Sequence, residues 1–352
     1  SVPFVKATSE GHKEFIRQNN PTEHIAAVNK MQNTAWKINS KVFEVQRAIF
    51  KAGKGGTGIP RFLPKPLLPY PVHLQPIPVA LLTEKQKEEV LEWKIATKKI
   101  HTANRMMKAK VIAYKMTYDG AVEYLNMESL YFVYNTDFRG RVYCATSGLS
   151  PQGNDTSKAL LQFADGVTIG ESGLQWLAIH GANTYGNDKI TNEERVDWIK
   201  SIERQLHSVV ESPLDTQEFW GSADKPWQFL AFAFEWAACD YGRNPQWRSV
   251  LPIGLDGSCN GIQHYSAILR DNIGGKGVNL IDSRTPNDIY QEVADELVRL
   301  LRREDTKEAR QWIDSGFTRK LTKRPVMTLP YGSTQQSART YVLEWIGDNS
   351  DV

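Results

Sequence analysis

The hydrophobic positions along the chain repeat mostly at helical spacing. Between Asn33 and Lys51 the apolar residues fall about one helical turn apart, which predicts a helix there. The residues that carry this pattern are Trp36, Val42, Phe43 and Ile49. Thr83 and Gln86 have the spacing of a capping box and predict the start of another helix. Further helices are predicted at residues 171–183, 192–211, 226–241, 286–304 and 317–331.

Strand patterns are short and few. The stretch LYFVYNTDFRGRVYCATSG, residues 130–148, has the pattern of two strands around a turn. The glycine-rich GKGGTG at residues 53–58 lacks the residue order of a phosphate-binding loop and is predicted to be a connector. Seven prolines between Pro60 and Pro78 predict an extended loop or linker. The expected fold class is mainly α with small β elements (α+β).

Composition limits the class of protein more than the partners. The 352 residues are 41% hydrophobic and 24% charged, as in an ordinary globular protein, and the net charge is only +3. The three cysteines, Cys144, Cys239 and Cys259, are far apart, which predicts free, mostly buried thiols in a reducing compartment. Neither a membrane-spanning run nor a signal peptide is visible in the sequence.

One helical stretch is strongly basic. No acidic residue occurs between Trp93 and Tyr118. The cations of this helix are Lys94, Lys98, Lys99, Arg105, Lys108, Lys110 and Lys115. A solvated helix face is one interpretation, but such faces usually mix both signs of charge. We therefore favour a face that binds phosphates, with the solvated face as the alternative.

The stretch LPIGLDGSCNGIQHYSA, residues 251–267, places one carboxylate after an apolar segment. We expect a buried strand that ends at Asp256, followed by a small-residue turn that lets a ligand approach the backbone. A carboxylate there is a suitable ligand for Mg²⁺, and a helix cap is the equally weighted alternative. Cys259 and His264 lack further ligands at zinc spacing, so we expect a packed thiol and a hydrogen-bonded histidine.

The stretch TRKLTKRPVMTLPYGS, residues 318–333, carries a second candidate surface. Its members recur every four residues and would line one side of a helix. They are Arg319, Lys323, Met327 and Tyr331. The cations would bind phosphates and the aromatic ring would stack on a base, whereas the alternative is a basic helix whose Met and Tyr face the core. Pro325 and Pro330 predict a bend, or a helix that begins near Pro325.

The third motif is NTDFRGRVY, residues 135–143. Asp137, Arg139 and Arg141 crowd a turn that contains a glycine. Two arginines at this spacing lie on one face of an extended ribbon, where Asp137 can orient one of them. A salt bridge that only stabilises the hairpin is the alternative.

Together these motifs resemble those of the single-subunit RNA polymerases of bacteriophages and mitochondria. DFRGR at Asp137–Arg141 is similar to the family's D-x-x-G-R loop, and DGSCNGIQH at Asp256–His264 is similar to its catalytic palm motif. Arg319-x3-Lys323-x3-Met327-Thr328-x2-Tyr331-Gly332 is similar to its fingers-helix motif. PQGND (151–155), IHGAN (179–183) and NTAWKIN (33–39) also resemble the phage branch, and the likeness runs from about Asn33 to Ser333.

The resemblance implies a role for each candidate residue. Asp256, helped by the Gly257 carbonyl, would hold two Mg²⁺ ions, and Arg319 and Lys323 would clamp the incoming triphosphate. Lys323 would also donate a proton to the leaving group. The weaker candidates at the nucleotide are Arg324, Tyr290 and, beside the new base pair, Tyr331 with Gly332. Arg139 and Arg141, oriented by Asp137, would contact the template–RNA hybrid.

The resemblance also implies a right-hand polymerase fold of palm, thumb and fingers. We expect a thumb-side helix and connector at 1–82, a palm-side region at 83–270 and the start of the fingers at 271–352. The expected partners are a DNA template, the RNA product and ribonucleoside triphosphates. The expected location is the cytoplasm of a phage-infected bacterium, with the mitochondrial matrix as the alternative.

Two further residues favour RNA over DNA synthesis. Related DNA polymerases carry a bulky side chain five residues after the palm aspartate, where it blocks a 2′-hydroxyl. The corresponding residue here is Gly261, which blocks nothing. The Tyr331 hydroxyl is available to help recognise the ribose.

One departure from the family pattern bears on activity. The family supplies a second catalytic carboxylate in a His-Asp-Ser turn, and none of the seven histidines here precedes an aspartate. One carboxylate holds two divalent ions poorly. We therefore expect a central fragment, or one part of a split enzyme whose remainder is a separate chain, that is inactive alone. The alternative is a non-catalytic remnant that binds nucleic acid.

Overall fold

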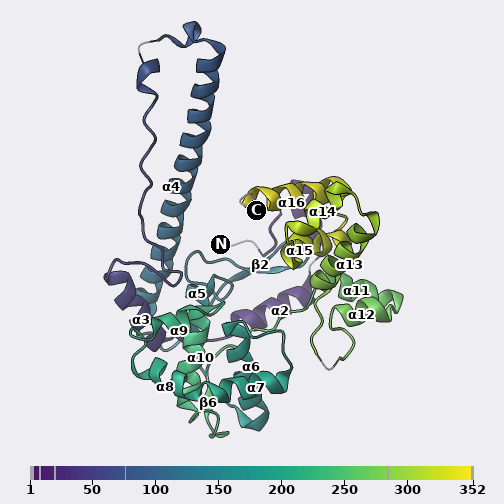
Figure 1. The fold of residues 1–352 in the computed structure, drawn as a ribbon. Coiled ribbons are helices and arrows are strands. Elements are labelled where there is room, and N and C mark those ends of the chain that lie inside the picture. Colours follow the sequence, from purple (N-terminus) through teal and green to yellow (C-terminus); the bar gives the residue numbers. More distant parts are fainter. Residues whose placement is uncertain (1–3, 8, 20, 76, 284, 350–352) are drawn as a thin grey trace. The chain divides into compact units, whose positions relative to one another are not determined.

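The computed structural model describes residues 4–7, 9–19, 21–75, 77–283 and 285–349 (Figure 1). The chain divides into two compact units. Unit 1 comprises Ser1–Gly186 and Val196–Ile253, and unit 2 comprises Asn187–Arg195 and Gly254–Val352. Helix α7, Asn192–Ser201, crosses the boundary between them. None of the helices in the described ranges is long and apolar enough to cross a membrane.

The described part of unit 1 is a helical assembly with three small two-stranded antiparallel sheets. The sheets pair β1 with β4, β2 with β3 and β5 with β6. The strands are β1 (Trp36–Ile38), β2 (Tyr134–Thr136), β3 (Val142–Cys144), β4 (Leu161–Phe163), β5 (Val167–Thr168) and β6 (Arg248–Ser249). The helices are α1 (Glu10–Gln18), α2 (Thr22–Gln32), α3 (Ser40–Lys51), α4 (Glu84–Tyr124), α5 (Asp155–Ala159), α6 (Gly170–Tyr185), α8 (Glu203–Glu211), α9 (Gln217–Gly221) and α10 (Pro226–Ala238), with short 3₁₀ turns η1 (Val72–Leu74) and η2 (Val79–Leu81). The mainly α class with small β elements is confirmed.

Two predicted helices have different bounds in the structure. The helix predicted from Asn33 begins only at Ser40, because the Asn39 side chain accepts a hydrogen bond from the Val42 amide and caps α3 there. Trp36 lies instead in β1, where it pairs with Phe163 of β4. The single helix predicted at 192–211 is interrupted at Ile202 and forms α7 and α8.

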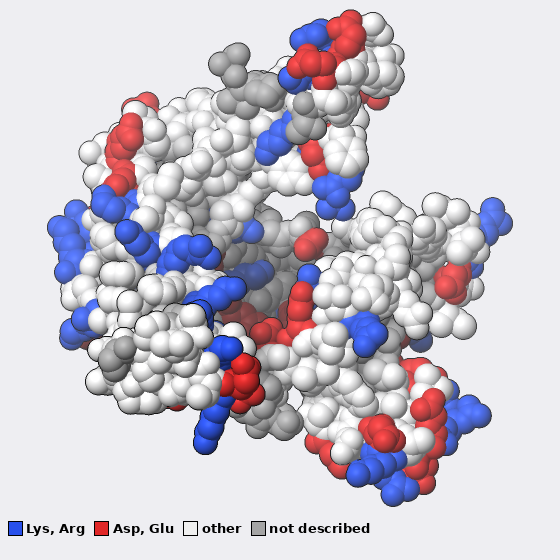
Figure 2. Space-filling model, turned by 90° about the horizontal axis from the view of Figure 1, so that it is seen from above, with Lys and Arg blue, Asp and Glu red and all other residues white. Residues whose placement is uncertain are grey.

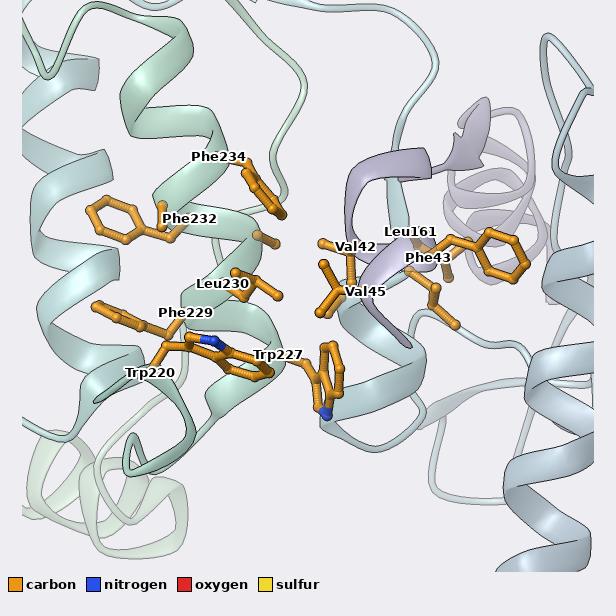
Figure 3. Close-up of a cluster of buried hydrophobic side chains, with 14 of the residues drawn as sticks. Val42, Phe43, Val45, Leu161, Trp220, Trp227, Phe229, Leu230, Phe232 and Phe234 are labelled. Atoms are coloured by element: carbon orange, nitrogen blue, oxygen red, sulfur yellow. The ribbon is translucent and has the colours of Figure 1, made fainter. Parts of the chain in front are cut away.

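Helix α10 lies at the centre of the unit 1 core. It packs against α3, α5, α6, α8 and α9. Figure 3 shows Val42 and Val45 of α3 pointing toward α10, whose Leu230 and Trp227 face them. Each fully buried side chain of this size contributes about 1.5–3 kcal/mol to the free energy of folding.

Gly181, in the IHGAN motif, explains how closely α6 approaches α10. A Cβ at position 181 would lie 2.4–2.7 Å from ring atoms of Phe232, which is fully buried. Any side chain would therefore force the two helices apart. The neighbouring His180 is buried as well, and burial lowers its pKa to about 4, so this imidazole is neutral near pH 7.

Asp155, in the PQGND motif, connects α5 to the start of α10. Its carboxylate accepts hydrogen bonds from the backbone amides of Trp227 and Gln228 at 2.8 and 3.1 Å, and from the Gln228 side chain at 3.1 Å. These amides belong to the first turn of α10, which has no capping side chain of its own. A negative charge at a helix N-terminus is favourable, so Asp155 fixes the position of α10.

Helix α4 is 41 residues long and begins with the predicted capping box of Thr83 and Gln86. The proline-rich segment is extended, as predicted, and lies beside this helix (Figure 1). Lys65 exchanges two backbone hydrogen bonds with the Asn104 side chain, at 2.8 and 2.9 Å. The Trp93 indole donates to the Leu68 carbonyl at 3.1 Å. The segment therefore supports α4 along its length.

Unit 2 is helical and has a small core of its own. Its helices are α11 (Asn260–Leu269), α12 (Asn272–Gly277), α13 (Ile289–Glu304), α14 (Lys307–Asp314), α15 (Arg319–Thr328) and α16 (Gln335–Asp348), with the 3₁₀ turn η3 (Leu329–Tyr331). Its buried apolar centre consists of Ala294 of α13, Leu321 of α15 and Phe317, which lies in the turn before α15. Leu297, Val298, Leu301, Trp312, Val342 and Trp345 pack around them.

The strand expected to end at Asp256 is not formed. Strand β6 stops at Ser249, and residues 251–257 have no regular secondary structure. Leu255 is 83% exposed, so the apolar run does not continue into a core. The apolar run before Asp256 was misleading, because a short apolar run forms a buried strand only when a neighbouring strand pairs with it. No strand pairs with residues 251–257 in the described ranges.

The carboxylate of Asp155 provides a test of this fold. We expect Asp155→Ala to lower the free energy of unfolding by about 2–3 kcal/mol, because it leaves the first-turn amides of α10 unpaired. Urea unfolding followed by circular dichroism measures this change. Asp165→Ala, at an exposed aspartate of the same unit, is the control and should change stability by less than about 0.5 kcal/mol. Equal stabilities of the two variants would contradict the capping role.

Candidate nucleotide and metal site

The turn that carries Asp256 leaves its carboxylate in solvent. Asp256 is exposed, and its Oδ1 accepts a hydrogen bond from the adjacent Gly257 amide at 2.8 Å. Helix α11 begins at Asn260 with Cys259 in the N-cap position, so the alternative that Asp256 caps this helix is wrong. A Cβ on Gly257 would lie 2.0 Å from Asn260 Oδ1, so any other residue here would displace the Asn260 side chain.

The same turn contains a residue in an unusual backbone conformation. Cys259 has a φ of +57°, in the left-handed region, and its thiol is buried. All three cysteines are free, as predicted. His264 is exposed and makes no hydrogen bond within the described ranges, so the expected hydrogen-bonded histidine is wrong.

Helix α15 carries both predicted cations, of which Lys323 is exposed and Arg319 is only partly exposed. It begins at Arg319, where the Thr318 side chain caps it, and Pro325 lies inside it. Lys323 is exposed, whereas Leu321 and Thr322 on the opposite side are buried. The helix therefore does not begin near Pro325.

Met327 and Tyr331, the next two members of the four-residue repeat, also face outward. Met327 is 41% exposed and Tyr331 is 62% exposed. The alternative in which Met327 and Tyr331 pack into the core is therefore wrong. Gly332 follows with a φ of +83°, and its amide closes the η3 turn onto Leu329 at 3.1 Å.

The Asp256 turn and α15 are linked within unit 2 through two neighbouring elements, η3 and α13. A Cβ on Gly261 would lie 2.7 Å from Pro330 Cβ, so the missing side chain is what lets α11 touch η3. Tyr265 strengthens this contact with a hydroxyl that donates to the Pro330 carbonyl at 3.4 Å. A Cβ on Gly261 would also lie 3.5 Å from the ring of Tyr331.

Tyr290 of α13 makes the second link. Burial, and then its hydrogen bond with the Cys259 thiol, raise the pKa of Tyr290 to about 12. Its backbone carbonyl accepts a hydrogen bond from the Thr322 hydroxyl at 2.6 Å, and the Arg319 guanidinium lies 5.5 Å from its ring centroid. Tyr290 therefore joins the turn after Asp256 to the first turns of α15.

Asp288 and Lys189 belong to the same neighbourhood, although the sequence analysis missed both. Asp288 Oδ2 lies 2.7 Å from Arg319 Nε and 3.8 Å from Lys189 Nζ. Before a helix, an aspartate is typical of a cap, and Asp288 does cap α13. Its ion pairs join residues that are far apart in the sequence, so no local pattern indicates them.

Arg324 points elsewhere. Its guanidinium pairs with Glu344 and lies 4.1 Å from the centroid of Tyr341, both on α16. This side chain is thus already engaged within unit 2, and its nucleotide contact remains a prediction.

The donors at this site fit one part of a magnesium site. Among the residues that the structure describes, no three His, Cys, Asp or Glu side chains are grouped to hold a metal ion. Asp256 and the Gly257 carbonyl supply two oxygen donors at an exposed turn. Mg²⁺ in proteins usually keeps several waters and takes one or two carboxylates together with substrate phosphates. The donor set is consistent with such an open site, not with a closed protein cage.

The DFRGR loop belongs to unit 1 and forms the tip of the predicted hairpin between β2 and β3. Asp137 accepts from the Arg139 amide at 2.8 Å, from Arg139 Nη2 at 2.7 Å and from the Tyr143 hydroxyl at 3.1 Å. Burial raises the pKa of Asp137, but these bonds and one from the Arg141 amide outweigh it and lower the pKa to about 2. The loop thus contains the Asp137–Arg139 salt bridge that the alternative interpretation, a bridge that stabilises the hairpin, requires. The same salt bridge also orients Arg139.

Part of the basic stretch forms one face of α4. Lys94, Lys98, His101 and Arg105 recur at three- and four-residue steps and line a groove along the helix. Figure 2 shows Lys and Arg side chains gathered on the left of the view, the side on which Figure 1 draws α4. Lys115 has an acidic neighbour, Asp119, at 2.6 Å.

Comparison with known proteins agrees with these motifs. A family model described as DNA-dependent RNA polymerase matches residues 167–352. T7 RNA polymerase of Escherichia phage T7 is 37% identical over 348 residues, which cover 90% of this chain. The mitochondrial DNA-directed RNA polymerases of Neurospora crassa and Homo sapiens are 36% and 30% identical, over 89% and 97% of this chain.

The matched region is a limited part of each relative. The chain spans 38% of the phage T7 enzyme, 22% of the Neurospora crassa enzyme and 28% of the human enzyme. The match nevertheless covers the Asp256 turn, α15 and the residues that join them. This chain therefore belongs to the family of DNA-dependent RNA polymerases found in bacteriophages and mitochondria.

Proposed function

We propose that this chain carries the nucleotide-binding half of a centre for template-directed RNA synthesis from ribonucleoside triphosphates. The observation that supports it best is that, in unit 2, the exposed carboxylate turn and the cationic helix α15 are joined through shared neighbours, η3 and Tyr290 of α13. Gly261 against Pro330, and Cys259 against Tyr290, bring the Asp256 turn to α15. A polymerase needs this combination, because the reacting phosphates carry charge that both metal ions and cations must balance.

Each side chain has a distinct task in this proposal. In this proposal Arg319 and Lys323 bind the triphosphate, and Lys323 gives a proton to the leaving pyrophosphate. Asp256 and the Gly257 carbonyl would hold magnesium, which supplies charge neutralisation for the displacement. Tyr331 with Gly332 lies beside the new base pair, and Gly261 carries no side chain that could block a 2′-hydroxyl. Arg139 and Arg141 contact the template–RNA hybrid.

The number of oxygen ligands available for metal ions determines whether the isolated chain is active in this proposal. Asp256 is one carboxylate, whereas holding two divalent ions takes more oxygen ligands than one turn provides. We infer that polymerisation requires a further carboxylate from another segment or chain. The relatives come from phages and mitochondria, so the proposed compartment is the cytoplasm of an infected bacterium, with the mitochondrial matrix as the second candidate.

A second candidate function is nucleic-acid binding without catalysis. The observation that favours it is the basic face of α4, which offers Lys94, Lys98 and Arg105 to a phosphate backbone. This function needs neither Asp256 nor a second carboxylate. The two functions are distinguished by the separate tests that follow.

Triphosphate binding tests the first function. We expect Arg319→Gln and Lys323→Gln each to weaken the binding of Mg²⁺–ATP to this chain by about 10-fold, because each removes a cation from the phosphates. Isothermal titration calorimetry measures the affinity. Lys320→Gln is the matched control, since Lys320 is an exposed lysine one position along α15. An equally large loss of affinity in Lys320→Gln would contradict the assignment of Arg319 and Lys323 to the triphosphate.

Salt dependence tests the second function. We expect the logarithm of the affinity for duplex DNA to fall linearly with the logarithm of salt concentration. Lys98→Gln and Arg105→Gln should each reduce that slope by about 0.9, since each contact releases counterions. The control is Lys110→Gln, an exposed lysine of α4 outside the groove. Slopes that are identical in all three variants would exclude this face as the phosphate contact.

A further inference from the structure

Asp288 is the most unusual carboxylate in the neighbourhood of the proposed phosphate site. Its side chain is only 15% exposed, and its two oxygens serve different partners. Oδ1 accepts from the backbone amides of Tyr290 and Gln291, at 3.1 and 3.4 Å, and so caps α13. Oδ2 faces two cations from different parts of the chain, Arg319 and Lys189.

The pairing with Arg319 is close but poorly directed. Oδ2 is 2.7 Å from Arg319 Nε, yet Nε makes no hydrogen bond within the described part of the chain. The N–H therefore does not point at the carboxylate, and the contact rests on charge. Its geometry is constrained because Oδ1 is committed to the helix cap. This ion pair lacks the added strength of a directed, charge-assisted hydrogen bond, so an anion with better geometry competes with it more effectively.

Lys189 completes a set of two cations around one carboxylate. Its Nζ lies 3.8 Å from Asp288 Oδ2 and 3.2 Å from Asp188 Oδ2, and its side chain is 56% exposed. The Arg319 side chain is 35% exposed. Both cations thus have one side against Asp288 and another side that an incoming anion can reach.

We propose that Asp288 is an internal competitor for the phosphates of the ligand, and that it limits the affinity of Arg319 and Lys189 for pyrophosphate and triphosphate groups. The proposal rests on the proposed function, in which Arg319 binds the triphosphate. An anion held by these cations lies within a few ångströms of a largely desolvated carboxylate, where like charges repel strongly. A polymerase benefits from such a limit, because the product pyrophosphate must leave after each addition.

A role for Asp288 in preorganising Arg319 would have the opposite effect on anion affinity. If Asp288 mainly preorganised Arg319, its loss would weaken anion binding through the ordering cost of one side chain. The repulsion from a buried carboxylate is the larger effect at this separation. The competitor role therefore predicts tighter binding when the charge is removed.

The test is Asp288→Asn, which removes the charge and keeps a side chain that caps helices as well as aspartate does. Calorimetry with pyrophosphate and with ATP, each with Mg²⁺, should show binding at least about 5-fold tighter than in the parent chain. The affinity should also fall more steeply with salt. Asp288→Ser, which also caps and carries no charge, should give the same result.

Asp271→Asn is the matched control. Asp271 caps α12 through Oδ1 and the Ile273 amide at 3.0 Å, and it pairs with no cation among the described residues. This variant should bind both anions as the parent does. Equal or weaker binding by a folded Asp288→Asn chain, or absence of binding in all variants, would overturn the proposal.

The outcomes separate this proposal from the proposed function. Binding that depends on Arg319 but is not tightened in Asp288→Asn contradicts only the competitor role. Binding that is tightened in Asp288→Asn but unaffected by Arg319→Gln contradicts the role of Arg319 in the proposed function. In that second case the competitor role survives only if Lys189→Gln weakens binding, and an unchanged affinity in Lys189→Gln overturns it.

Discussion

The close contact between Gly261 and the Pro330–Tyr331 turn is the constraint on which unit 2 depends. With no Cβ at position 261, α11 reaches the end of α15, and a methyl group there would lie 2.7 Å from Pro330. From the sequence, Gly261 is expected to matter only for the ribose. Its packing adds a second reason for glycine, since the position of Tyr331 depends on the same missing side chain. Gly261 therefore affects both the position of the Tyr331 ring and the access of the ribose.

The rest of the site is held together by residues that each make two different contacts. Tyr290 binds Cys259 through its hydroxyl and Thr322 through its carbonyl, so the turn and the helix share one support. Asp288 caps α13 and also neutralises Arg319. Such double use is typical of sites in which charged groups must be held near one another without a large core. The buried apolar centre of unit 2 is indeed small.

The sequence predicted local features well where the signal was local. The capping box at Thr83 and the hairpin at Asp137 were both correct, because side-chain caps and turn residues act within a few positions. Trp36 was misassigned to a helix because its strand exists only through pairing with β4, which lies far along the chain. The strand expected before Asp256 failed for the converse reason, since no strand pairs with residues 251–257 in the described ranges. Asp288 and Lys189 were missed because their contacts are made only in the folded unit.

The central claim is that Asp256 and the cations of α15 surround one bound metal–nucleotide complex. Cleavage of the backbone by Fe²⁺ in place of Mg²⁺, with ATP and ascorbate present, tests it directly, because hydroxyl radicals cut only near the ion. The claim predicts cuts near Asp256 and near the segment from Arg319 to Tyr331, both lost in Asp256→Ala. Cuts confined to other segments, or an unchanged pattern in Asp256→Ala, would contradict it.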